Sequence, residues 1–109
     1  MAYTNVHRGA RISPKKARPV ADQIRGKKAE DALTILRMSK RRGAYYLRKA
    51  LEAAIANADQ KEADVRNLWV TDVRVDDGQR MKRFQPKDRG RAHAIIKRTS
   101  HLTVAVDLR

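Results

Sequence analysis

Positively charged side chains are concentrated in the stretch 79–100, which lies between two apolar runs. It contains eight Lys and Arg residues and one acid, Asp88, so its net charge is +7, half of the +14 of the whole chain. Guanidinium groups form paired hydrogen bonds with phosphate and can stack on bases. We therefore expect a polyanion, structured RNA above all, to bind Arg80, Lys82, Arg83, Lys87, Arg89, Arg91, Lys97 and Arg98.

A second basic zone covers residues 1–28, where eight cations face one acid, Asp22, and again give a net +7. The remaining residues hold ten cations and ten acids, so the charge is segregated rather than spread for solubility. The alternative is that the cations of this zone only form ordinary solvent-exposed faces of helices. We expect a second phosphate-binding surface made of Arg8, Arg11, Lys15, Lys16, Arg18, Arg25, Lys27 and Lys28.

The chain carries little that could support catalysis, so we expect no enzyme, no cofactor and no metal. Cysteine is absent, and His7, His93 and His101 lack the i, i+4 spacing of a helical zinc site. The alternative is a nuclease site built from His and Asp. For the histidines we favour phosphate contact, or a surface role at the end of a strand, over such a site. The tyrosine pair Tyr45–Tyr46 is expected to pack in or at the rim of the core rather than stack on bases.

The apolar periodicity predicts three helices. Ser13 and Pro14 are typical N-cap and first-turn residues, Pro19 predicts a kink or an irregular first half, and Gly26 is a candidate C-terminal cap. Further helices are expected over 29–38 and 44–58, joined by a basic connector, 39–43.

Alternating residues predict strands over 5–12, 68–76 and 102–108. We expect Val6, Ala10 and Ile12 to share one face of the first, and Trp69, Thr71, Val73 and Val75 one face of the second. The last two strands flank the basic stretch, so we expect them to pair antiparallel. The long connection between them, 79–100, would then form a hairpin arm with its tip at 86–91. A solvated, disordered loop is the alternative, but Met81, Phe84, Ile95 and Ile96 favour an ordered arm.

The predicted fold class is α+β: three helices packed on a small antiparallel β-sheet with one long protruding β-hairpin, in a single domain over 1–109. No apolar run approaches the ~20 residues needed to span a bilayer. No secretory segment is evident at the N-terminus, so we expect a cytoplasmic protein without a membrane partner.

Four segments resemble the bacterial large-subunit ribosomal protein twenty-two family in order and spacing: SPKKARPVADQIRGK, LEAAIANA, MKRFQPKDRGRA and IKRTSHLTVAV. The resemblance implies a globular domain bound to 23S ribosomal RNA, a role in subunit assembly, and a hairpin lining the nascent-peptide exit tunnel. Its implied partners are the nascent polypeptide and the L-four family at the tunnel constriction, and we expect a monomer outside the ribosome. The implied tunnel-lining tip residues are Met81, Lys82, Arg83, Arg89, Gly90, Arg91 and Ala92.

The chain departs from the family pattern at two positions, Pro19, where leucine is common, and Asp88, an acid near the tip. The competing hypothesis is a histone-like architectural DNA-binding protein with basic β-arms. That function needs a dimer with a broad apolar interface, and the three helices leave little apolar surface for one. Stable dimers that prefer bent DNA over ribosomal RNA would favour it.

Overall fold

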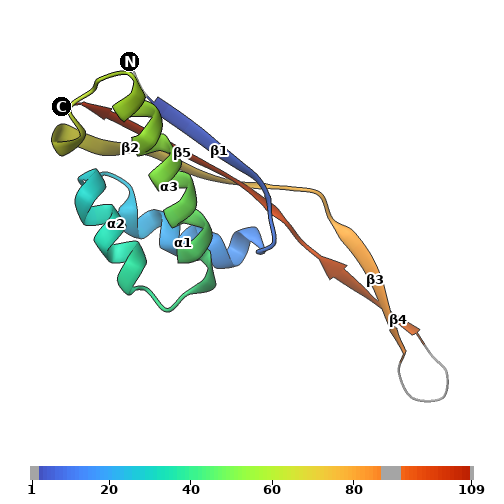
Figure 1. The fold of residues 1–109 in the computed structure, drawn as a ribbon. Coiled ribbons are helices and arrows are strands. Elements are labelled where there is room, and N and C mark those ends of the chain that lie inside the picture. The colour runs from blue at the N-terminus through green and yellow to red at the C-terminus, as the bar shows by residue number, and fades with distance from the viewer. Residues whose placement is uncertain (1–2, 87–91, 109) are drawn as a thin grey trace.

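The computed structural model describes residues 3–86 and 92–108, in which three α-helices cover one face of a three-stranded antiparallel sheet (Figure 1). The sheet has the order β1-β5-β2, and the ladder β3-β4 extends away from it. This confirms the predicted α+β class. The elements are β1 (Tyr3–Ala10), α1 (Pro14–Ile24), α2 (Ala29–Met38), α3 (Arg42–Gln60), the 3-10 turn η1 (Val65–Asn67), β2 (Leu68–Asp77), β3 (Met81–Pro86), β4 (Ala92–Lys97) and β5 (Ser100–Leu108).

The core lies between α3 and the sheet, because α3 crosses β1 and β5 while α1 packs on β2. The stripe predicted for the third helix is confirmed: Leu47, Leu51 and Ala54 are fully buried. Its alanines let the helix backbone come close to the sheet, and they favour helix in their own right. No helix in the described part of the chain is both long and apolar enough to cross a membrane.

Helix α1 begins and ends near the predicted residues. Ser13 occupies the N-cap position without a side-chain hydrogen bond to the helix, and Pro14 is the first helical residue. The helix continues without a break through Pro19, which is exposed, so the expected irregular first half is absent. Gly26 follows the C-cap residue Arg25 with φ +79°, a left-handed conformation in which glycine is unstrained.

The predicted inward face of the first strand is wrong. Val6 is 41% exposed, whereas Tyr3 and His7 are half-buried. The ladder between β1 and β5 changes register between His7 and Ala10, and Gly9 within this irregularity has φ +70°. A bulge of this kind inserts a residue and reverses the alternation, so Ala10 and Ile12 are buried as predicted and Val6 is not.

The same error affects the predicted face of the second strand. Leu68 and Val70 are fully buried, and Trp69 and Thr71 are not. The register with β5 shifts between Val70 and Asp72, so the residues after the irregularity follow the opposite phase. Val73 therefore shares the core face with Val70, and not with Trp69 as predicted.

The arm joins the sheet through residues 78–80 and 98–99, which we call the neck. The β2–β5 ladder ends at the pair Asp77–Ser100, and the β3–β4 ladder begins at Met81–Lys97. Across the neck, the Gly78 N–H donates to the Thr99 carbonyl at 2.8 Å. A Cβ on Gly78 would lie 2.5 Å from the Thr99 hydroxyl oxygen, so this close approach requires glycine.

Candidate nucleic-acid interface

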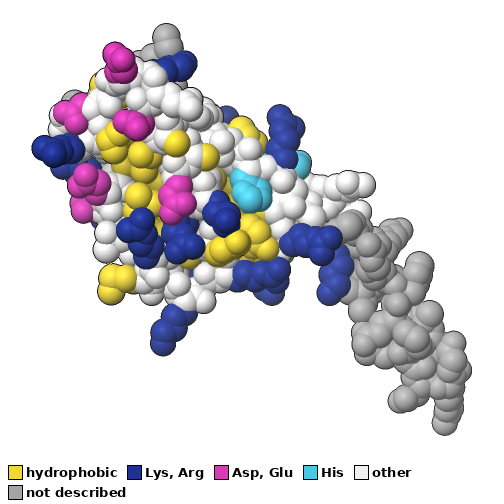
Figure 2. Space-filling model, in the orientation of Figure 1, with side chains coloured by type: hydrophobic (Ala, Val, Ile, Leu, Met, Phe, Trp, Pro, Cys, Tyr) yellow, Lys and Arg dark blue, Asp and Glu magenta, His cyan; other side chains and the backbone are white. Residues whose placement is uncertain are grey.

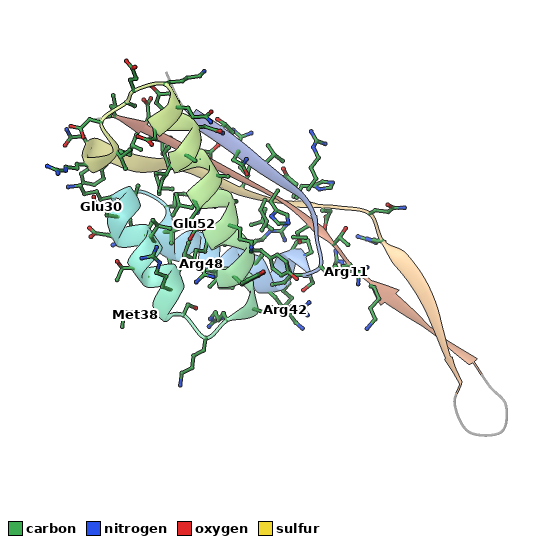
Figure 3. The ribbon with its side chains drawn as sticks, viewed as in Figure 1. Arg11, Glu30, Met38, Arg42, Arg48 and Glu52 are labelled. Carbon is green, nitrogen blue, oxygen red and sulfur yellow. The ribbon has the colours of Figure 1, made fainter. Side chains whose placement is uncertain are left out.

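Cations from four separate segments surround a hollow beside the neck, which we call the neck pocket. Its volume is about 350 Å³. The contributing segments are the β1–α1 turn, the first turns of α1 and α3, and the end of the arm. Figure 3 shows two of the side chains, Arg11 and Arg42, at the end of the helical layer nearest the arm. The lining residues are Arg11, Ile12, Ser13, Lys16, Arg42, Lys97 and Arg98.

Close packing of two helix starts brings these cations together. A Cβ on Gly43 would lie 3.3 Å from both the Ala17 Cα and the Ile12 Cδ1, so the absence of a side chain allows α3 to approach α1 here. The buried Ser100 hydroxyl donates to the Ile12 carbonyl at 2.6 Å. That bond fixes the β1–α1 turn to β5 at the base of the arm.

The two helices that begin at the neck pocket add to its positive potential. Neither Ser13 nor Arg41, their N-cap residues, makes a side-chain capping bond, and neither helix has an acid in its first turn. By contrast, α2 carries Glu30 and Asp31 in its first turn. The positive ends of the α1 and α3 dipoles are therefore without carboxylates of their own, which favours a bound anion.

Two neighbouring hollows extend the neck pocket into one basic surface. One, of about 350 Å³, is lined by Arg8, Gly9, Arg11, Gln79, Thr99 and His101. The other, of about 230 Å³, is lined by Ile12, Lys16, Arg41, Arg42 and Gly43. In the view of Figure 2, Lys and Arg side chains gather where the arm leaves the globular part, and acidic side chains lie farther from it. This arrangement can hold several phosphates around the base of the arm.

The chain matches the family model described as Ribosomal protein L22p/L17e over residues 5–107. The chain belongs to this family. The match runs from β1 to β5 and so covers the arm and every cation of the basic surface. The resemblance found in the sequence is confirmed, and the protein is a structural protein of the large ribosomal subunit in the cytoplasm.

Some residues of each predicted basic zone lie together on this surface. The predicted RNA-binding residues that line its hollows are Arg8, Arg11, Lys16, Lys97 and Arg98. Arg98 also forms a 3.2 Å salt bridge with Asp77 across the neck. Lys15, Lys27 and Arg80 are exposed elsewhere, and Lys28 is half-buried.

The remaining predicted cations of the arm have no described side chains. The β3 and β4 backbones pair from Met81–Lys97 to Pro86–Ala92. Met81, Lys82 and Arg83 therefore lie on the half of the ladder nearest the neck, and Ala92 lies at its far end. Lys87, Arg89, Gly90 and Arg91 lie outside the described residues, as does Asp88.

Arg18 and Arg25 hold the fold together, a role that the sequence did not predict. The Arg25 guanidinium donates to the Val73 carbonyl at 2.7 Å and pairs with Asp22 at 2.6 Å. Arg18 reaches the Val75 carbonyl at 3.5 Å. Arg18 on α1 and Arg25 at its C-cap are seven residues apart, and they donate to alternate carbonyls of the edge strand β2.

Sequence reasoning missed Arg41 and Arg42. Arg41 is the N-cap of α3 and Arg42 its first residue, and both were counted among the charge-balanced remainder of the chain. The signal that could have found them is three consecutive cations, Lys40 to Arg42, at the start of a helix whose first turn has no acid.

The histidines with described side chains have structural contacts. His7 meets the Tyr46 ring edge-on at 5.8 Å between centroids, and the His101 Nδ1 accepts from the Gly9 N–H at 3.1 Å. Over the described residues, no group of three or more His, Cys, Asp or Glu side chains is arranged to hold a metal ion.

Proposed function

We propose that the protein binds 23S ribosomal RNA through the neck pocket and the arm, and that this binding supports assembly of the large subunit. The observation that carries the proposal is the convergence of Arg11, Lys16, Arg42, Lys97 and Arg98 around one concave site. A hollow with cations on several sides fits a phosphate that projects from a bent backbone. A flat basic face would instead suit a regular duplex of any sequence.

The proposal extends to the arm through the family resemblance. The molecule measures 62 Å along its longest axis and 24 and 16 Å along the others. A molecule of this length can place its arm in the exit tunnel while the globular part binds RNA at the neck pocket. The tip, including Arg89, Gly90 and Arg91, would then line the tunnel beside the L-four family protein and the nascent polypeptide.

The register of the arm refines this proposal. Met81 to Arg83 lie near the neck in the β3–β4 ladder, so they would contact the tunnel wall before the constriction rather than form the tip itself. A change in the number of residues here would shift the pairing and so move the tip.

The test compares two variants that each remove two charges. Lys16→Ala/Arg42→Ala removes cations of the neck pocket, and Lys61→Ala/Arg66→Ala removes exposed cations at the far end of the fold. Binding to a 23S RNA transcript is measured between 50 and 200 mM salt, with transfer RNA and duplex DNA as competitors. For each lost contact, the log–log salt slope falls by about 0.7–0.9.

We expect a shallower salt slope and weaker binding for the neck-pocket variant only. Equal slopes for the two variants would mean that the cations act through net charge alone, and that the pocket is not the binding site. Equal competition by duplex DNA and by the ribosomal transcript would favour the architectural DNA-binding function instead.

A further inference from the structure

The tyrosine pair at the start of α3 is divided between a packed ring and an exposed one. Tyr46 is half-buried and meets His7 edge-on, with the ring planes at 83°. Tyr45 contacts Tyr46 edge-on at 5.3 Å between centroids, yet it is 50% exposed. The prediction that both rings pack therefore holds for Tyr46 alone, and a rigid neighbour keeps Tyr45 at the surface.

Arg42 connects this aromatic pair to the neck pocket. Its guanidinium lies 5.9 Å from the Tyr46 ring centroid, donates to the Tyr46 hydroxyl at 3.3 Å, and also lines the pocket. Beyond the pair, Lys49 Nζ and the Arg48 guanidinium lie 5.0 and 5.9 Å from the Tyr45 centroid. Tyr45 is thus the exposed aromatic in a row of cations that begins at the pocket.

We propose that Tyr45 stacks on an unpaired base of the ribosomal RNA whose backbone phosphate occupies the neck pocket. This inference rests on the proposed function and adds a base contact to it. Aromatic rings stack on any base, and a cation beside the ring strengthens the contact with both base and phosphate. Lys49 lies 5.0 Å from the ring centroid and supplies a positive charge for the phosphate of the same nucleotide, whereas Arg48 also pairs with Glu52 at 3.8 Å.

The surroundings of Tyr45 favour a base over a protein partner. Docking of a protein usually requires a contiguous apolar patch. Among the described residues, the large exposed hydrophobics Val6, Met38, Tyr45 and Leu108 lie on four different elements. The Tyr45 ring contacts Tyr46 and two cations, so its surroundings suit a planar group attached to phosphates.

Three substitutions at one position test the stacking. Tyr45→Phe keeps the ring, Tyr45→Leu keeps apolar volume without a ring, and Tyr45→Ala removes both. We expect Phe to bind the 23S transcript like the wild type, and Leu and Ala to lose roughly tenfold in affinity. Because a base carries no charge, the salt slope stays unchanged in all three.

The outcomes separate this inference from the proposed function. Wild-type affinity for Tyr45→Leu, or a reduced salt slope for Tyr45→Ala, would overturn stacking while leaving the result for Lys16→Ala/Arg42→Ala to decide RNA binding. Ultraviolet crosslinking of assembled subunits gives a second readout on the tryptic peptide 43–48. We expect a nucleotide adduct on Tyr45, and a crosslink to another protein at that ring would refute the proposal.

Discussion

Removal of the Ser100 hydroxyl should destabilise the fold at the point where the neck pocket is built. Ser100 is fully buried, and its hydroxyl lies 2.6 Å from the Ile12 carbonyl oxygen. Ile12 is itself 4% exposed, so water has little access to that carbonyl. The substitution Ser100→Ala removes the donor and leaves a buried acceptor without this partner.

The expected loss is about 1–3 kcal/mol of unfolding free energy, the usual penalty for an unsatisfied buried polar group. It is a sizeable share of the roughly 5–15 kcal/mol that stabilises a typical domain. For a chain of this length, such a loss lowers the melting temperature by at least about 4 °C. RNA binding at the neck pocket should weaken as well, because Ile12 lines the pocket.

The measurement is urea and thermal unfolding followed by circular dichroism, with Thr34→Ala as the matched control. Thr34 also donates its hydroxyl to a carbonyl, that of Glu30 at 3.1 Å, but on an exposed helix face. Its removal should change stability by less than about 0.5 kcal/mol, because water replaces the bond and alanine favours helix. Equal unfolding free energies for the two variants would refute the claim that the Ser100 bond holds the turn.

Three further substitutions test the fold around the site. Arg25→Ala should lower stability by about 1 kcal/mol, because the Val73 carbonyl loses its donor; a reduced salt slope for RNA binding would instead make Arg25 a phosphate contact. Gly78→Ala should cost about 1–3 kcal/mol in thermal unfolding, since its Cβ would meet Thr99 at 2.5 Å; unchanged amide exchange at the neck would argue against that contact. Leu47→Ala should cost about 2–5 kcal/mol in urea unfolding, because the side chain is fully buried; a loss below 1 kcal/mol would contradict its central place in the core.

The helices were predictable because each depends on local spacing and end signals. The stripe of α3 and the left-handed Gly26 after α1 both follow from neighbours within a few residues. The strand faces were not predictable to the same degree, because one inserted residue reverses the alternation. Gly9 lies in the first register shift, between His7 and Ala10, and nothing in the sequence around Thr71 marked the second.

The candidate site was predictable in charge but not in shape. The two basic zones were visible in the sequence, yet their meeting depends on contacts such as the hydrogen bond from Ser100 to the Ile12 carbonyl, which joins positions distant in the chain. The same limit applies to Arg25, whose cationic side chain suggested phosphate. Its bond to the Val73 carbonyl is revealed only by the packing of α1 along β2.

The covered edge of β2 affects how the free chain behaves before it is assembled into the subunit. An open strand edge is a template for pairing between copies of a chain. Here the backbone of Gly26 and Lys27 pairs with Val70, and Arg18 and Arg25 cover the carbonyls farther along β2. The packing of α1 and of the loop after it along β2 therefore leaves less of this edge open for pairing between copies of the free chain.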